Sequence, residues 1–178
     1  MAYDTEELER QAQKAIDTLP KYKDFDSFIY MEDAESMFSE TMESESAFVD
    51  SFIYQVKPMI ESVYEAKVIS VETEKCFKFR KAGLFNFRAD IYVRAEENDF
   101  LIEAKNPTHT FRESIAGITQ LMTYDIALER MDVDVKKIYL SSTIEPMVIE
   151  FIKKYNLDID VFLFNGKQTA LWDNSLTN

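Results

Sequence analysis

The sequence predicts an α/β domain built on one mixed sheet, an α+β-like arrangement, and three observations lead to this class. Segments with short apolar runs or period-2 alternation read as strands, and three of them follow closely enough to form an antiparallel meander: 67–79, 87–95 and 100–106. Two longer segments repeat their apolar residues at helical spacing: 44–65 and 111–130. A strand at 136–141 follows a helix, so it is expected to run parallel to the strand at 100–106.

The helix expected at 44–65 has a clear start and one weak point. Ser44 is a plausible N-cap, because a serine oxygen can accept a hydrogen bond from the first turn. Pro58 lies inside the segment, so a kink or a break near Val56 is expected. The apolar face that would pack on the sheet consists of Phe48, Phe52, Val56, Met59, Ile60 and Val63.

Short residue patterns also mark the ends of the helices and the hairpin in the second half of the chain. Thr110 and Glu113 match a capping box that opens the next helix. The buried stripe expected for that helix is Phe111, Ile115, Ile118, Met122 and Ile126. A shorter helix is expected from Pro146 to Asn156, and a final hairpin around residues 165–166, an Asn-Gly pair. The predicted order is α-β-β-β-α-β-α-β with an additional edge strand.

Composition limits the class of protein. With 178 residues and 46% hydrophobic residues, the chain is long enough for one domain with a proper core. An acidic helix and arm are expected over 1–43, before a main domain over 44–178. No apolar run approaches the ~20 residues of a membrane span, and the acidic start does not resemble a secretory signal. A single cysteine, Cys76, suits the reducing cytoplasm.

Three charged residues stand at one end of an otherwise apolar hairpin. Glu103 and Lys105 are two apart on one strand, so they leave the same face, and Asp90 on the preceding strand is expected opposite them. Adjacent carboxylates repel each other, and a divalent cation removes that repulsion. Mg²⁺ takes hard oxygen ligands and keeps several waters, one of which can act as a nucleophile. These residues therefore suggest metal-assisted hydrolysis of a phosphodiester.

The same residues resemble a known family. An Asp in RADIYV, Glu-x-Lys in FLIEAKN and Q-x-x-x-Y on the next helix (Gln120, Tyr124) are similar to the PD-(D/E)xK nuclease superfamily. The likeness is greatest to the nuclease domains of type I restriction endonucleases and related phage or prokaryotic nucleases, and it covers about residues 44–164. One departure is that Ala89, not proline, precedes Asp90.

This resemblance implies a restriction-endonuclease-like core, α-β-β-β-α-β, with flanking helices and a C-terminal hairpin. It implies a DNA endonuclease in which Asp90, Glu103 and the Ala104 carbonyl hold Mg²⁺ or Mn²⁺, while Lys105 positions the attacking water. An acid from the first core helix often joins such sites, and Glu45 is the first choice for it, with Glu43 second. The alternative for Glu45 is a favourable contact with the helix dipole.

Gln120 and Tyr124 lie four apart on one helix face, so they are expected to support the site at its rim. Packing in the core, with the amide and hydroxyl bonded locally, is the alternative.

The charge distribution bears on the substrate. The net charge of −13 is unusual for a nucleic-acid enzyme, but residues 1–65 carry 16 acids against 5 bases, whereas residues 66–112 carry 7 acids against 9 bases. Basic residues that could contact DNA precede the candidate site or open the next helix: Lys75, Lys78, Arg80, Lys81, Arg88 and Arg112. The alternative is an ordinary solvated, ion-paired surface.

A different class of function stays open. A nuclease-like acidic protein without activity could bind a protein partner through its N-terminal region, or mimic DNA in another protein's basic groove. DNA is expected over RNA as a substrate, a homodimer is left open, and no membrane contact is expected.

Overall fold

The structure is a computed structural model, and it describes residues 21–22, 44–78, 86–105, 110–142, 146–164 and 169–172. Their helices and strands are, in chain order, β1 (Lys21–Tyr22), α4 (Glu45–Tyr64), β2 (Val68–Lys78), β3 (Asn86–Ala95), β4 (Asp99–Lys105), α5 (Phe111–Glu129), β5 (Val135–Ser141), α6 (Pro146–Lys154), β6 (Ile159–Phe164) and β7 (Thr169–Trp172). The chain is therefore an α/β protein, as the sequence predicted. Within these ranges, no helix is long and apolar enough to cross a membrane.

One mixed sheet organises the molecule. Its strands lie in the order β1-β7-β6-β5-β4-β3-β2. The first three long strands, β2, β3 and β4, form the expected antiparallel meander. The crossover through α5 then returns the chain so that β5 runs parallel to β4, and β6 runs parallel to β5. The last strand, β7, pairs antiparallel with β6 and completes the predicted C-terminal hairpin.

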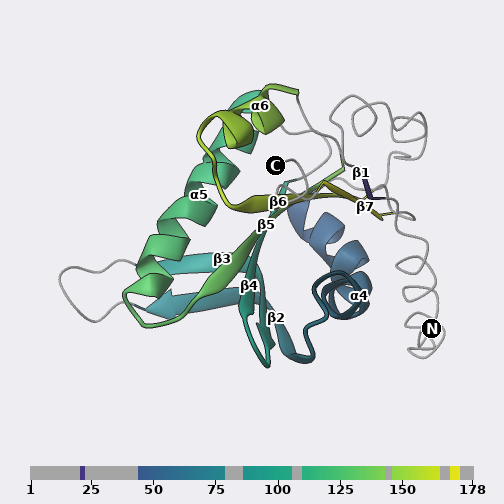
Figure 1. The fold of residues 1–178 in the computed structure, drawn as a ribbon, viewed down its shortest axis with the longest axis vertical. Coiled ribbons are helices and arrows are strands. Elements are labelled where there is room, and N and C mark those ends of the chain that lie inside the picture. Colours follow the sequence, from purple (N-terminus) through teal and green to yellow (C-terminus); the bar gives the residue numbers. More distant parts are fainter. Residues whose placement is uncertain are drawn as a thin grey trace.

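Helices cover both faces of this sheet (Figure 1). On one face, α4 packs its aromatic residues against the sheet; the rings of Phe52 and Phe164, for example, lie 5.0 Å apart. On the other face, residues of α5 and α6 share a second apolar cluster with β3, β4, β5 and β6. The central strands β4, β5 and β6 are thus buried on both sides, so a charged residue in them needs a local partner.

Local chemistry explains the ends of the two long helices. The Ser44 side chain accepts a hydrogen bond from the Ala47 amide and caps α4, as predicted. Thr110 and Glu113 form the predicted capping box at the start of α5. Of the kink or break expected near Val56, the break was wrong, because α4 continues through Pro58 to Tyr64. Burial of the residues on either side of the proline holds the helix on the sheet and offsets the lost backbone hydrogen bond.

The rotation of α5 about its axis differs from the predicted one. The expected stripe includes Phe111 and Ile126, yet their exposed fractions are 38% and 53%. The buried residues of α5 are instead Ser114, Gly117, Ile118, Leu121, Ala127 and Leu128. Small residues at Ser114 and Gly117 let the helix lie close to the sheet at one point, and this close approach turns the larger apolar residues sideways.

Candidate active site

Strand pairing brings the two central acids together. Ile91 of β3 pairs with Ile102 of β4, so the next residues along, Asp90 and Glu103, stand opposite each other. Asp90 is fixed there because its Oδ2 accepts a hydrogen bond of 2.8 Å from the Ala104 amide. The sequence-based placement of Asp90 across from Glu103 therefore agrees with the strand register.

Lys105 lies at the centre of the site. Its Nζ donates to Glu103 Oε1 at 2.6 Å and to the Ala104 carbonyl at 3.0 Å. A third contact of 3.3 Å reaches Oε2 of Glu45, which is contributed by the first turn of α4. Four side chains from three elements thus meet here, and we refer to Glu45, Asp90, Glu103 and Lys105 as the acid–lysine cluster.

The cluster is buried on one side and open on the other. Lys105 and Glu103 are buried, with Glu103 only 3% exposed, whereas the Glu45 side chain is 45% exposed. Solvent therefore reaches the Glu45 side chain, whereas Glu103 and Lys105 are enclosed. An ammonium shared among several oxygens in this way is held in one position, because leaving any of these acceptors unpaired would be costly.

Helix α5 closes the cluster from above through Gly117. A Cβ added at this glycine would lie 2.8 Å from Lys105 Cε, 3.3 Å from Tyr139 Cε2 and 3.4 Å from Glu103 Cγ. The absence of a side chain therefore lets the lysine pass beneath the helix. The sequence alone did not predict that Lys105 would fill the space left by this glycine.

Tyr139 and Ser141 are the site residues that sequence reasoning missed. On β5, Tyr139 pairs with Glu103 and Ser141 with Lys105. Tyr139 is fully buried, and burial raises the pKa of its hydroxyl to about 12, so the group stays protonated. The Ser141 hydroxyl donates to the Lys105 carbonyl at 3.5 Å. Only the register of the parallel strands could have identified them, and no sequence feature specifies that register.

Burial raises the pKa of both central acids, whereas the surrounding acids keep Lys105 charged. Burial, followed by the charge of Asp90, raises the pKa of Glu103 to about 8. Burial also raises the pKa of Asp90, although its hydrogen bond from Ala104 opposes the change. For Lys105, burial alone would lower the pKa, but the charges of the surrounding acids outweigh it and raise the pKa above its usual value. The two acids therefore crowd each other, as expected where a cation would relieve them.

The donor set of the cluster suits a hard cation. The bonds described above use Asp90 Oδ2 and Glu103 Oε1, and the remaining carboxylate oxygens, with the Ala104 carbonyl, are the donors that Mg²⁺ or Mn²⁺ prefers. Mg²⁺ commonly binds through one or two carboxylates and completes its shell with water. In the ranges described by the structure, no three His, Cys, Asp or Glu side chains are grouped as a ready metal site. Asp90, Glu103 and the Ala104 carbonyl supply oxygen donors of the type that Mg²⁺ accepts, and their use as its ligands stays a prediction.

The predicted supporting pair lies on α5, where its members contact each other. Gln120 Nε2 donates to the Tyr124 hydroxyl at 3.4 Å. The Tyr124 ring stacks on Phe87 of β3, with ring centroids 4.2 Å apart. The core-packing alternative thus describes the contacts of Tyr124 well, and a role for this pair at the rim of the site stays a prediction.

The predicted DNA-contacting residues are only partly within the described structure. Lys78 and Arg112 are exposed, as a phosphate contact requires. Arg88 is exposed too, but it forms an ion pair of 2.5 Å with Glu74, which matches the ion-paired alternative. Arg80 and Lys81 lie outside the described residues, as do Glu43 and the acidic segment before it, except for the two residues of β1.

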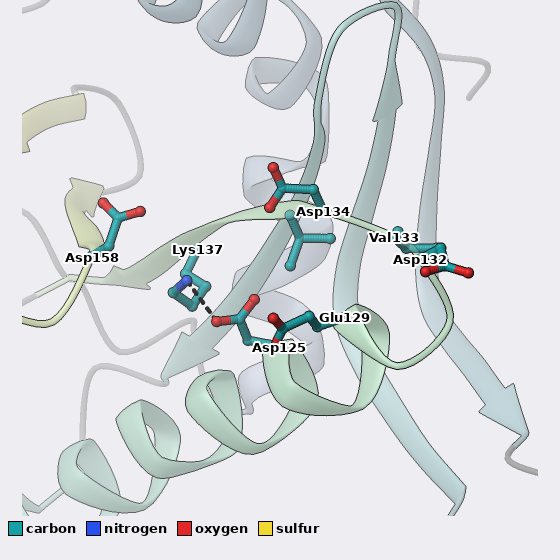
Figure 2. Close-up of a pocket in the computed structure, with 8 residues that line it drawn as sticks. Asp125, Glu129, Asp132, Val133, Asp134, Lys137 and Asp158 are labelled. Atoms are coloured by element: carbon teal, nitrogen blue, oxygen red, sulfur yellow. Dashed lines mark hydrogen bonds and ion pairs between the residues drawn. The ribbon is translucent and has the colours of Figure 1, made fainter. Parts of the chain in front are cut away.

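A separate pocket lies at the opposite end of the sheet. It has a volume of about 560 Å³ and is lined by Asp125, Glu129, Asp132, Val133, Asp134, Val135, Lys137 and Asp158. Figure 2 shows its acidic side chains around Lys137, whose ammonium lies 2.8 Å from Asp125. The pocket borders the first residues of β5, whereas Lys105 is level with the last residue of that strand. It is thus spatially distinct from the acid–lysine cluster.

Comparisons of the chain with protein-family models, with curated proteins and with solved structures found no match.

Proposed function

We propose that this protein is a metal-dependent nuclease of the PD-(D/E)xK type, which hydrolyses phosphodiester bonds with DNA as the expected substrate. The observation that carries the proposal is that Glu103 and Glu45 both contact the buried ammonium of Lys105, while the Ala104 amide fixes Asp90 opposite Glu103. Two opposed acids and a lysine at one end of paired strands are costly for stability alone, so a role in binding and chemistry is the better explanation.

The fold is compatible with this proposal. Residues of α4, β2, β3, β4, α5 and β5 follow the order α-β-β-β-α-β, which is the order that the family resemblance implies. The likeness to the family consists of this order of elements and of the site residues. A division between the arm over 1–43 and the domain over 44–178, and a cytoplasmic location suited to the free, exposed Cys76, are further parts of the proposal.

Each residue of the cluster has a distinct task in the proposed reaction. Asp90 and Glu103, with the Ala104 carbonyl, would hold Mg²⁺ or Mn²⁺, which supplies Lewis acidity and an activated water. Lys105 orients the attacking water and stabilises negative charge on the phosphate, because its ammonium is fixed by Glu103 and Ala104. Glu45, at the open side of the site, acts as an accessory acid. Gln120 and Tyr124 support the wall formed by α5.

The direct test compares cleavage by the wild type and by Lys105→Ala. Circular single- and double-stranded DNA and an RNA oligonucleotide are incubated with Mg²⁺ or Mn²⁺, and nicking and linearisation are followed on gels. We expect metal-dependent cleavage of DNA that falls by about 100-fold or more in the variant, as when a single charge-stabilising group is removed elsewhere.

A matched control exists in the same sheet. Lys137→Ala removes another buried lysine that is paired with an acid, but at the opposite end of β5. Cleavage should persist in this variant once it is compared at equal folded fraction. If the wild type cleaves no substrate with either metal, or if both lysine variants lose activity equally, the nuclease proposal fails.

One observation favours the second candidate, a non-catalytic acidic protein that binds a basic partner or mimics DNA. The described surface includes five acids around the pocket at the far end of the sheet, in a chain whose net charge is −13. A protein of this kind would not need metal. Capture of a basic partner by the wild type and by Lys105→Ala with equal affinity, together with absent cleavage, would support it.

A further inference from the structure

Three hydroxyl groups lie in the interior beside the acid–lysine cluster, and the reaction proposed above uses none of them. They belong to Ser114 of α5 and to Tyr139 and Ser141 of β5, and each of these residues has an exposed fraction of 0%. The Tyr139 hydroxyl is hydrogen-bonded to both serines. Because an unpaired buried hydroxyl is costly, the contacts among the three groups hold this network in one arrangement.

The network connects the first turn of α5 to the backbone of Lys105. At one end, the Ser114 hydroxyl donates to the Thr110 carbonyl at 3.4 Å. At the other end, the Ser141 hydroxyl donates to the Lys105 carbonyl at 3.5 Å. Because Ser141 uses its proton there, Tyr139 must be the donor in the hydrogen bond between the two. The tyrosine can donate, since burial raises the pKa of its hydroxyl to about 12 and the group stays protonated.

The same network joins helix and strand where the Lys105 side chain passes between them. Ser114 stands three residues before Gly117, so both lie on one side of α5. A Cβ added at Gly117 would lie 3.3 Å from Tyr139 Cε2 and 2.8 Å from Lys105 Cε. On the strand side, Ser141 pairs with Lys105. The tyrosine ring and the lysine chain therefore lie against the same turn of the helix.

We propose that Tyr139 is a positioning residue for Lys105: by tying Ser114 of α5 to Ser141 of β5, its hydroxyl fixes the distance of the helix from the lysine and thereby the place of the ammonium. This role rests on the proposed nuclease function, in which Lys105 orients the attacking water. Tyr139 acts through Lys105 and exchanges no proton with the substrate.

Packing alone does not require these hydroxyls, because a phenylalanine and two alanines of nearly the same shape would fill the space without polar groups. The lysine does require a fixed surrounding. Its ammonium contacts Glu103 at 2.6 Å, the Ala104 carbonyl at 3.0 Å and Glu45 at 3.3 Å, so a small movement would exchange one contact for another. In enzymes, a misplacement of about 1 Å can cost about 100-fold in rate. A rigid connection between α5 and β5 at this point therefore serves the chemistry more than the fold.

The test removes the Tyr139 hydroxyl and observes the Lys105 ammonium directly. Proton–nitrogen NMR spectra of the full chain, recorded without metal or DNA, detect a lysine ammonium whose protons are held in hydrogen bonds. The signal that is missing in Lys105→Ala belongs to Lys105. We expect Tyr139→Phe to shift or abolish this signal. The ammonium of Lys137, another buried lysine, is paired with Asp125 and serves as the internal control, so its signal should stay.

Tyr64→Phe is the matched control variant. The Tyr64 hydroxyl also forms a hydrogen bond within the protein, to Asp160 at 2.7 Å, but it belongs to α4. Its removal should leave the Lys105 signal unchanged at equal folded fraction. Ser114→Ala removes the other end of the network and should reproduce the effect of Tyr139→Phe, with no further change in the double variant. The serine variant decides the question even if Tyr139→Phe does not fold.

Cleavage kinetics give a second readout. We expect Tyr139→Phe to lower kcat for DNA at least about tenfold and to leave KM within about twofold, because the substrate still binds while the water is misplaced. A wild type without a Lys105 signal, a Tyr139→Phe variant with an unchanged signal, or an equal loss in Tyr64→Phe would overturn the proposal. A wild type that cleaves no DNA would instead refute the nuclease function, whereas the spectra would still decide the role of Tyr139.

Discussion

The protonation of Glu103 gives a prediction about stability that needs no substrate. Burial and the neighbouring charge of Asp90 raise the pKa of Glu103 from its ordinary value of 4.5 to about 8 in the folded protein. Between these values the folded protein keeps a proton that the unfolded chain releases. Stability from this group is therefore fully present below about pH 4.5 and is lost as the pH rises through about 8.

The size of this stability change follows from the pH range between the unfolded and folded pKa values of Glu103. At 1.36 kcal/mol for each pH unit, the whole window corresponds to about 5 kcal/mol, and the part between about pH 5 and about pH 7 to about 2.5 kcal/mol. No discount for solvent screening is needed, since Glu103 is only 3% exposed. Lys105 does not contribute in this range, because its raised pKa keeps it charged in both states.

The assay is urea unfolding across this pH range, without metal, for the wild type and for Glu103→Gln. Glutamine imitates the protonated acid in shape and charge, so the variant should lose this part of the pH dependence and be the more stable protein near pH 8. Glu45→Gln is the control, because the Glu45 side chain is 45% exposed, and it should keep the wild-type slope. Other titrating groups cancel in the comparison. Equal slopes for the wild type and Glu103→Gln would refute the reasoning and show that Lys105 keeps Glu103 ionised when folded.

Four further predictions concern single positions. Gly117→Ala places a methyl group 2.8 Å from Lys105 Cε. The resulting strain of about 1–3 kcal/mol should outweigh a helix-propensity gain of about 1 kcal/mol, so urea unfolding should show a less stable protein. A more stable variant would mean that the lysine moves aside freely. Thr110→Ala removes the capping box of α5 and should cost about 1 kcal/mol in the same assay, and no change would make the cap unimportant. Lys137→Ala breaks a buried ion pair and should cost about 3 kcal/mol, whereas a cost near zero would place that pair in solvent. Mg²⁺ should raise the melting temperature of the wild type but not the melting temperature of Asp90→Asn. At an Mg²⁺ concentration of about 100 times the dissociation constant, the stabilisation of the wild type should be about 2.7 kcal/mol. An equal rise in both proteins would show that Asp90 does not bind the metal.

Local patterns in the sequence were sufficient to predict most of the fold. Apolar residues that alternate with polar ones or form short runs identified β2, β3 and β4. The crossover rule predicted that β5 runs parallel to β4. The caps at Ser44 and Thr110 were readable because capping depends on a side chain and an amide within the same few residues. Register across a short connection is similarly local, which is why Asp90 could be placed opposite Glu103.

Features that depend on packing between distant segments were not predictable in the same way. The stripe expected on α5 followed from apolar spacing alone, whereas the actual rotation depends on the close approach of Gly117 to Lys105 and Tyr139. Pro58 was expected to kink or break α4, and the helix is unbroken because apolar residues hold both of its halves on the sheet. In both cases a local rule was overridden by burial that no short segment encodes.

The position of Lys105 connects these points to function. Its ammonium donates to Glu103 and to Glu45, so these groups are paired within the protein and the cluster can fold without any bound ion. Metal binding at Asp90 and Glu103 would then compete with the existing contact between Glu103 and Lys105. Release of that contact would leave the ammonium free to face a phosphate, next to the acids that hold the ion. A buried ion pair whose members both gain a new partner when substrate and metal arrive differs physically from a permanent structural pair such as Lys137 with Asp125. Under the proposed function, the same four side chains would serve stability in the free protein and chemistry in the complex.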